Sequence, residues 1–234
     1  MDYNIEKKQL NLVSLSYDRA ILSGKKGINF YDNLPEYIKN DPDYRAFVKL
    51  MNEGSSSARP EIKKYLNPKK NMKFIDLGCC LNLMFNGYDG WPSTYYGIDI
   101  SVETIKLLKE FSQKKNLSIG LLHCGSIHKT PFDNNCFDIG ACVGVLEYFD
   151  KDYALKSIKE INRILKPEAK IIIEIPNIIS PICKIMVMVE EYLGRPEQFN
   201  MLPSEFENML KEYFIIEKKE EVDPMIQYFL ICKK

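Results

Sequence analysis

Two acidic residues, each in a short apolar run beside a glycine, are the first features of this sequence that could do chemistry. Asp76 lies in the run 74–77 just before Gly78, and Asp99 closes the next such run, 97–99. The two carboxylates are 23 positions apart, about the separation at which nucleotide-binding α/β folds bring a carboxylate to ribose hydroxyls. One glycine turn after a strand is a weak signal, but two linked matches are more specific. The pattern predicts a site for a nucleoside-containing cofactor.

The elements that must hold these carboxylates follow from the hydrophobic pattern, in which short apolar runs alternate with helical periodicity. The pattern predicts strands over 73–77, 95–100, 117–123, 136–143 and 170–175, and helices over 101–114 and 150–165. A helix over 205–213 and an antiparallel pair over 214–219 and 226–232 follow. The fold class is therefore α/β, with a mostly parallel sheet flanked by helices and an antiparallel C-terminal edge.

The first 70 residues have a different character. They are rich in charge and broken by several prolines, which indicates short helices and no strand. We expect a helical N-terminal extension or lid over 1–70, and a cofactor-binding domain over 71–234 with an insert at 177–203. The serine run at 55–57 is the expected flexible joint between them.

Composition narrows the class of protein. The chain has 234 residues, 32 basic and 32 acidic, and its pI is about 6.7, so it lacks the excess positive charge that binding along a nucleic acid usually leaves. Neither an apolar signal segment nor a run of roughly 20 apolar residues is present. We expect a cytoplasmic protein with no membrane span.

Metal binding is not expected. The seven cysteines are odd in number and lie mostly in apolar runs, which is typical of reduced core thiols. His123 and His128 are the only histidines, and no C-x-x-C pair accompanies them.

Further segments extend the first motif in chain order. Asp76-Leu77-Gly78-Cys79-Cys80-Leu81-Asn82 is similar to a D-x-G-x-G-x-G motif, and 130–138 to an L-P-F-x-x-x-x-F-D segment. The run 145–148 is similar to V-L-E-H, and 160–167 to the helix and turn before a fifth strand. In this combination, over about residues 72 to 177, the chain resembles the class I S-adenosylmethionine-dependent methyltransferases. The resemblance implies a Rossmann-like fold, S-adenosylmethionine as cofactor, and methyl transfer.

The resemblance also implies site residues. The loop that follows Asp76 would hold the methionine part, Asp99 would bind the ribose, and Ile100 would lie against adenine. Ser126 matches a position near adenine, where the family often has an acidic residue, and the backbone of Ile127 would bind the ring nitrogens. Val143 would lie beside the methionine part. By the same resemblance Tyr17 would close over the cofactor. The cofactor-binding residues so expected are Asp76, Gly78, Cys79, Cys80, Asp99, Ile100, Ser126, Ile127, Val143 and Tyr17.

The first motif departs from the family at its second and third glycines, which are Cys80 and Asn82 here. Both add bulk where backbone passes close to the ligand, although asparagine tolerates a left-handed backbone better than most residues. Segment 85–94, rich in glycine, replaces much of the usual first helix. The adjacent Cys79 and Cys80 leave redox or arsenic chemistry as a minor alternative.

The catalytic residue stays open. An in-line methyl transfer needs alignment and desolvation more than a base, and many relatives have no dedicated base. His128 and Tyr148 are weak candidates, with Glu147 beside the second, and a packing role is the more common one for each.

One helical segment and one arginine are candidates to shape the acceptor pocket or its lid. One helical face in 178–193 carries Ile182, Ile185, Met186 and Val189, which either line the pocket or pack on the core. The polar residues Lys184, Glu190 and Glu191 are then expected in solvent. Arg59 is a second candidate for the lid or for the cofactor carboxylate, with surface exposure as the plainer interpretation.

Three functions remain in competition. The neutral charge and the apolar insert favour methyl transfer to a small-molecule acceptor in an enclosed pocket. A protein or RNA methyltransferase would need the lysines at 63, 64, 69, 70 and 73 beside the cofactor mouth. A non-catalytic binding protein that retains the fold would be consistent with Cys80 and Asn82. Neither the acceptor atom nor the oligomeric state follows from the sequence.

Overall fold

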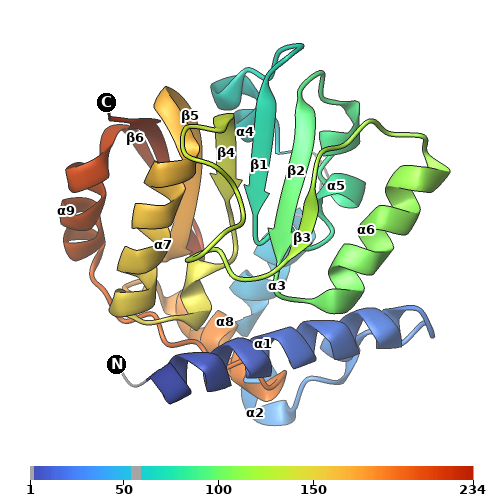
Figure 1. The fold of residues 1–234 in the computed structure, drawn as a ribbon. Coiled ribbons are helices and arrows are strands. Elements are labelled where there is room, and N and C mark those ends of the chain that lie inside the picture. The colour runs from blue at the N-terminus through green and yellow to red at the C-terminus, as the bar shows by residue number, and fades with distance from the viewer. Residues whose placement is uncertain (1–2, 54–58, 234) are drawn as a thin grey trace.

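A seven-stranded sheet forms the centre of the protein (Figure 1). The computed structural model describes residues 3–53 and 59–233, so the serine run at 55–57 lies outside the described residues. The strand order is β3-β2-β1-β4-β5-β7-β6, and only the pairs made by β7 are antiparallel. The expected α/β class with an antiparallel C-terminal edge is confirmed.

The strands are β1 (Lys73–Leu77), β2 (Thr94–Asp99), β3 (Leu122–Cys124), β4 (Phe137–Cys142), β5 (Leu165–Pro176), β6 (Phe214–Val222) and β7 (Met225–Cys232). The helices ahead of the sheet are α1 (Tyr3–Gly24), α2 (Glu36–Lys39), α3 (Tyr44–Glu53) and α4 (Pro60–Leu66). The later helices are α5 (Asn82–Phe85), α6 (Val102–Lys114), α7 (Lys151–Ile164), α8 (Pro181–Tyr192) and α9 (Pro203–Tyr213). Short 3-10 turns η1 (Phe30–Asn33), η2 (Tyr88–Gly90) and η3 (Leu146–Tyr148) complete the order.

Each face of the sheet has its own hydrophobic core. Helices α7 and α9 cover one face and belong to a core that also contains Ile75 and Leu77 of β1. Helices α4, α5 and α6 pack on the other, around Phe74. The central strands are apolar because both of their faces are covered, which explains the continuous apolar runs in the sequence.

The expected strand over 117–123 is wrong in extent, because only Leu122–Cys124 is a strand. At Gly120 the chain lies against β2, since its N–H donates to the carbonyl of Tyr95 at 2.7 Å, and a Cβ there would stand 2.3 Å from the ring of Tyr96. β5 begins earlier than expected: Leu165 already pairs with Phe137, and an irregularity follows in β4.

The N-terminal segment is helical and its described residues contain no strand, as expected. It is not made only of short helices, however, because α1 has 22 residues. In Figure 1 α1 lies across the ends toward which β1 and β2 point, which are the carboxyl ends of the parallel strands. Ligands of open α/β sheets bind at that end, so α1 is the element best placed to cover a site.

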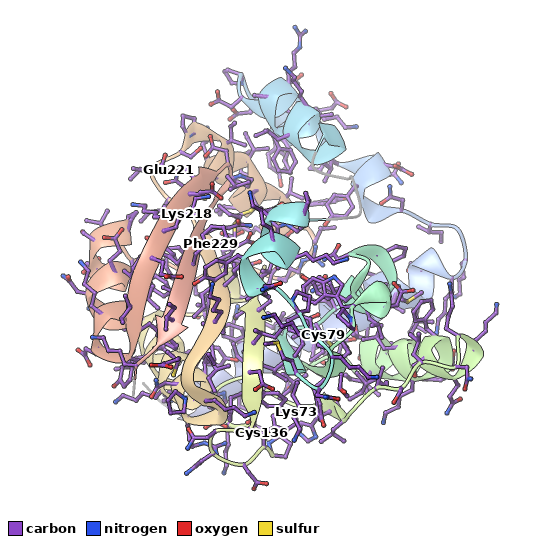
Figure 2. All side chains as sticks on the ribbon, turned by 90° about the horizontal axis from the view of Figure 1, so that it is seen from above. Lys73, Cys79, Cys136, Lys218, Glu221 and Phe229 are labelled. Atoms are coloured by element: carbon purple, nitrogen blue, oxygen red, sulfur yellow. The ribbon has the colours of Figure 1, made fainter. Side chains whose placement is uncertain are left out.

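The opposite, amino end of the sheet is seen from above in Figure 2, where Lys73 and Cys136 lie close together. Their Nζ and Sγ atoms are 4.0 Å apart. At the antiparallel edge Lys218 lies over the ring of Phe229, 5.0 Å from its centroid (Figure 2). Among the described residues no helix combines the length and apolarity needed to cross a membrane.

Candidate active site

A cavity lies where the carboxyl ends of β1, β2 and β4 meet α1, and we call it the central cavity. Loops after four strands and the inner face of α1 contribute to its wall. Its lining residues are Val13, Tyr17, Gly78, Cys80, Asp99, Ile100, Gly125, Ile127, Gly144, Val145, Tyr148, Phe149 and Tyr153. The lining is mainly apolar and carries one carboxylate, that of Asp99.

Asp99 is fixed by backbone donors at the end of β2. The N–H of Cys80 donates to its Oδ2 at 2.8 Å, and the N–H of Ser101 donates to its Oδ1 at 2.8 Å. Burial raises the pKa of Asp99 to about 6, although these two N–H groups oppose the rise. Each oxygen keeps a further lone pair, so the carboxylate is positioned to accept hydrogen bonds from a ligand.

Gly78 has to be glycine for a reason inside the protein. Its φ of +72° suits a residue without a side chain, and a Cβ there would stand 2.2 Å from Cγ2 of Val145. Gly144, after β4, also has a positive φ of +67°. Gly78 follows β1 and Gly144 follows β4, which are neighbouring strands. Because neither glycine has a side chain, both contribute only backbone to the wall of the central cavity.

Asp76 lies behind the loop rather than in the cavity wall. The hydroxyl of Tyr95 donates to its Oδ2 at 2.8 Å, and the amide of Asn82 lies 3.3 Å from the same oxygen. Burial raises its pKa to about 7. Asn82 is the first residue of α5, and its backbone is not left-handed, so the expected tolerance of asparagine for that conformation is not used here. Its side-chain amide instead contacts the carboxyl group of Asp76.

The two adjacent cysteines point in different directions. Cys80 lines the central cavity with a left-handed φ of +36°, whereas Cys79 is fully buried in the core around Phe74. Burial raises the pKa of Cys80 to about 12 and that of Cys79 well above its usual value. Reactive cysteines have lowered pKa values, so the thiol environment does not favour the redox or arsenic alternative.

Hydrogen bonds hold helix α1 against the residues that follow β2. Oγ of Ser14 donates to the carbonyl of Ile100 at 2.9 Å, and Oδ1 of Asp18 accepts from Oγ of Ser101 at 2.6 Å. The hydroxyls of Tyr17 and Tyr148 are 2.9 Å apart, and both rings line the cavity. The expected place of Tyr17 beside the cofactor site is consistent with this geometry.

The other expected site residues divide into two groups. Ile100 and Ile127 line the central cavity with Gly78, Cys80, Asp99 and Tyr17, whereas Asp76, Cys79, Ser126 and Val143 are not in its wall. The hydroxyl of Ser126 is engaged with Nδ1 of His128 at 2.6 Å and with the hydroxyl of Tyr153 at 2.7 Å. Their contact with a cofactor stays a prediction.

Of the two weak catalytic candidates, only Tyr148 reaches the cavity. His128 is occupied at both nitrogens, with Ser126 on one side and Glu6 at 3.4 Å from Nε2. Tyr148 donates to Oε2 of Glu190 at 3.0 Å, and burial raises its pKa well above the usual value. Neither environment is that of a general base near neutral pH.

Sequence reasoning missed several wall residues: Val13, Gly125, Gly144, Val145, Phe149 and Tyr153. A sequence signal existed for Gly144 and Val145. They come just after the apolar run of β4, in the same way that Gly78 comes just after the apolar run of β1. Phe149 and Tyr153 stack at 3.8 Å between ring centroids, and nothing in a single sequence indicates that pair.

The helix face of Ile182, Ile185, Met186 and Val189 does not line the central cavity. It packs against Leu34, Ile38 and Phe47 of the N-terminal segment. Glu191 and Lys184 are exposed as expected, but the solvent position expected for Glu190 is wrong. Glu190 is 8% exposed because it forms an ion pair with the buried Arg195.

Arg59 is not an exposed surface residue. Its Nη2 lies 2.6 Å from Oε1 of Glu174 near the carboxyl end of β5, and its side chain is 26% exposed. The arginine therefore neutralises a buried carboxylate. Because its guanidinium is engaged in this ion pair, it has fewer donors left for a cofactor carboxylate.

A second, more open pocket adjoins the central cavity, and we call it the outer pocket. It lies between α1, the segment after it, α5 and α6, and shares Tyr17 and Cys80 with the central cavity. Its lining residues are Tyr17, Ala20, Ile21, Gly24, Lys25, Ile28, Asn29, Tyr31, Cys80, Leu81, Phe85, Leu107, Leu193 and Arg195. Its wall is largely apolar.

Comparison with known proteins agrees with this geometry. Residues 75–173 match the family model described as a methyltransferase domain. An uncharacterized protein of Methanocaldococcus jannaschii is 34% identical over 147 residues, which are 60% of this chain and 59% of that relative. The chain thus aligns with little more than half the length of the curated relative.

Solved structures share the fold. The PH0226 protein of Pyrococcus horikoshii has a TM-score of 0.62 at 20% identity, covering 86% of this chain and 100% of that one. The 1,6-didemethyltoxoflavin-N1-methyltransferase of Burkholderia thailandensis, with S-adenosylhomocysteine bound, has a TM-score of 0.58 at 13% identity, covering 81% and 87%. The fold is thus Rossmann-like, and residues 75–173 within it are similar to a methyltransferase domain.

Proposed function

We propose that this protein transfers a methyl group from S-adenosylmethionine to a small-molecule acceptor. The observation that carries the proposal is the central cavity: one carboxylate at the end of β2, bare glycine backbone after β1 and β4, and a helix that covers them. A site covered by a helix suits a small acceptor better than an extended polymer.

The residues present fit the cofactor. Asp99 would accept the ribose hydroxyls, Ile100 and Ile127 would flank the adenine, and the backbone at Gly78 and Gly144 would allow close approach of the methionine part. Asp76 would act through the loop that it braces. Bound S-adenosylmethionine supplies an electrophilic methyl group on a sulfonium. The chain's own contribution is to align the acceptor and to exclude water.

A macromolecular substrate is less well supported. The lysines at 63, 64, 69, 70 and 73 are exposed on α4 and on the segment that enters β1. Lys73 begins β1, so the segment lies at the amino end of that strand, away from the central cavity. The basic cluster is therefore not beside the cofactor mouth, as a protein or RNA methyltransferase of this kind would require.

Methyl-labelled S-adenosylmethionine provides the test. The purified protein is incubated with label in a small-molecule extract, and in parallel with denatured protein and with RNA. We expect enzyme-dependent label in the small-molecule fraction alone. Label in protein or RNA would refute the acceptor class, and loss of all transfer with intact cofactor binding would favour a non-catalytic binding protein.

Cys80→Gly should bind S-adenosylhomocysteine at least as tightly as the wild type. Glycine removes a side chain from the cavity wall and relieves a left-handed backbone, which costs a non-glycine residue on the order of 1 kcal/mol. Calorimetry and thermal melting measure both effects, with Cys136→Ser at the far end of the sheet as the control. A loss of activity with binding retained would mean that the thiol has a chemical role.

Hydrogen exchange should show that the cover over the site responds to ligand. We propose that residues 178–203 and the described part of the first 60 or so residues close over the acceptor, because α1 already forms part of the cavity wall. Addition of S-adenosylhomocysteine should slow exchange in α1 and in 195–203, with β7 as the internal reference. Equal exchange in both states would indicate a static wall and another entrance for the acceptor.

A further inference from the structure

A chain of hydrogen bonds leads from a buried ion pair to the wall of the central cavity. Glu190 pairs with Arg195 through both carboxylate oxygens. The hydroxyl of Tyr148 donates to Oε2 of Glu190 at 3.0 Å, and the hydroxyl of Tyr17 lies 2.9 Å from that of Tyr148. Burial raises the pKa of both tyrosines well above the usual value, so each hydroxyl keeps its hydrogen near pH 7.

The number of hydrogens fixes the direction of this chain of hydrogen bonds. An ion-paired carboxylate only accepts, so the one hydrogen of Tyr148 is used on Glu190. Tyr148 then accepts from Tyr17, and this uses the one hydrogen of Tyr17. The oxygen of Tyr17 is left with lone pairs alone. It is therefore suited to accept a hydrogen bond from a ligand and not to donate one.

Tyr17 lies where the two cavities meet. It lines both the central cavity and the outer pocket, as Cys80 does. The guanidinium of Arg195 lies over the ring of Tyr17, 4.5 Å from its centroid, and Arg195 lines the outer pocket as well. A ligand that extends from the outer pocket into the central cavity therefore passes Tyr17.

The outer pocket is suited to an uncharged, apolar body. The apolar part of its wall includes Ile21, Ile28, Leu81, Phe85, Leu107 and Leu193. The two cations of the wall are both neutralised, Lys25 by Glu103 at 3.3 Å and Arg195 by Glu190. A charged ligand would therefore lose its hydration here without gaining a free counter-charge, which is costly.

We propose that the methyl acceptor is an uncharged hydroxyl compound, with its apolar body in the outer pocket and its hydroxyl donating to Tyr17. This inference rests on the proposed function and names its substrate class. The hydroxyl carries the hydrogen that the oxygen of Tyr17 lacks, and its neutrality suits the outer pocket. An ether or a ketone of the same shape has no hydrogen to donate to Tyr17.

The same chain of hydrogen bonds provides a path for the proton that the acceptor loses. As the acceptor oxygen bonds to the methyl carbon, the bond from that carbon to sulfur breaks, and its electron pair stays on sulfur. The acceptor proton moves to Tyr17, the proton of Tyr17 moves to Tyr148, and that of Tyr148 moves to Oε2 of Glu190. Neither tyrosine has to become a tyrosinate, which agrees with their raised pKa values.

Four probes of similar shape test the substrate class: 4-methylphenol, p-xylene, 4-methylbenzylamine and 4-methylbenzoate. Each is titrated into the wild type saturated with S-adenosylhomocysteine. We expect the phenol to bind at least about threefold more tightly than p-xylene, although transfer out of water favours the xylene. The two charged probes should bind about tenfold more weakly than the phenol. A phenol that binds no better than p-xylene or than either charged probe, or not at all in the millimolar range, would overturn the proposal.

Tyr17→Phe assigns the preference to one oxygen. This variant keeps the ring and removes the hydrogen-bond acceptor, so the phenol should lose its advantage over p-xylene. Tyr37→Phe is the matched control, because Tyr37 is 60% exposed on α2, and it should bind all four probes as the wild type does. A preference for the phenol that persists in Tyr17→Phe with S-adenosylhomocysteine bound would contradict the assignment.

Tyr148→Phe separates recognition from a structural role, because a gain in binding is expected. Without the oxygen of Tyr148, the hydrogen of Tyr17 is free and can be donated to a ligand. The ether 4-methylanisole, which only accepts, should therefore bind at least about threefold more tightly to Tyr148→Phe than to the wild type. A purely structural role of Tyr148 would weaken the binding of every probe alike, and that result would overturn the directed chain of hydrogen bonds.

The length of an alkyl chain tests the outer pocket. From 4-methylphenol to 4-butylphenol, the affinity of the wild type should rise about threefold to fourfold per methylene. Ile28→Lys places a charge in the wall of the outer pocket and should flatten this rise, whereas Ile215→Lys on the edge strand β6 should keep it. The two isoleucines are 50% and 54% exposed, so both variants are expected to fold. An equal rise in both variants would overturn the placement of the apolar body.

Binding of S-adenosylhomocysteine is measured first in every protein. Failure of the wild type to bind it would refute the proposed function, and this inference with it. Failure of the phenol alone, with S-adenosylhomocysteine bound, would refute only the substrate class.

Discussion

Asp99→Ala should weaken S-adenosylhomocysteine binding by about 100-fold or more while the protein stays folded. Among the described residues, this carboxylate is the only one in the wall of the central cavity, and two hydroxyls of one ribose would each lose a charged acceptor. Hydrogen bonds to charged groups contribute about 1.5–3 kcal/mol each, so the pair accounts for the expected loss. Titration calorimetry measures the affinity.

The control for this variant is Asp133→Ala, an exposed carboxylate in the loop before β4. It should bind as the wild type does. Because Asp99 also accepts from the N–H groups of Cys80 and Ser101, the melting temperature of Asp99→Ala has to be measured alongside. A folded Asp99→Ala protein with unchanged affinity would show that the ribose is bound elsewhere.

The raised pKa of Asp99 adds a pH signature. Its pKa in the folded protein is about 6, against an ordinary value of 3.8, so the ribose acceptor becomes protonated as pH falls through 6. Cofactor affinity should therefore decline below about pH 6 in the wild type. The contribution to folding has the opposite sense: the folded state holds the proton more tightly, so this group stabilises the fold most at low pH, and the stabilisation is lost as pH rises between the two values.

Gly78→Val should abolish cofactor binding and lower thermal stability. A Cβ at this position would overlap Cγ2 of Val145, and the backbone is left-handed, which a β-branched residue adopts at a cost of at least about 1–2 kcal/mol. The loop after β1 would have to move, and Cys80 and Asp99 with it. Cofactor titration and thermal melting together report the change.

A paired substitution identifies the cause. Gly78→Ala should be destabilising, and adding Val145→Ala should recover part of the loss, because the overlapping methyl groups are removed while the backbone strain stays. Gly90→Ala is the matched control, since no heavy atom lies within 4 Å of the Cβ that it would add and its φ is not in the left-handed region. If Gly78→Val bound the cofactor and melted as the wild type does, the steric argument for glycine at this position would be contradicted.

The sequence predicted the sheet well because its signals are local. Apolar runs that end at Gly78 and Asp99 give both the strand and the edge at which it ends, and Ser101 caps α6 as expected, accepting from the N–H of Thr104 at 3.0 Å. Those two runs also supply the part of the site that depends on β1 and β2. The methyltransferase resemblance extended the prediction to Ile127 through motif order.

The parts that the sequence did not predict depend on contacts between distant segments. Val13 lies in the cavity wall because α1 crosses the ends of the strands, and its own helix pattern does not show where that face packs. Glu190 is buried because Arg195, five residues later, pairs with it at the end of α8. Within the part of the chain that the structure describes, Glu147 forms no ion pair, and this likewise depends on which arginines the fold brings near.

The central claim is that this fold binds S-adenosylmethionine in the central cavity. Titration calorimetry of S-adenosylmethionine and S-adenosylhomocysteine into the wild-type protein tests it most directly. We expect both to bind in the micromolar range, about −8 kcal/mol, and both affinities to fall in Asp99→Ala. Absence of binding of either ligand to the well-folded wild type at millimolar concentration would contradict the account and leave a protein that keeps the fold without the cofactor.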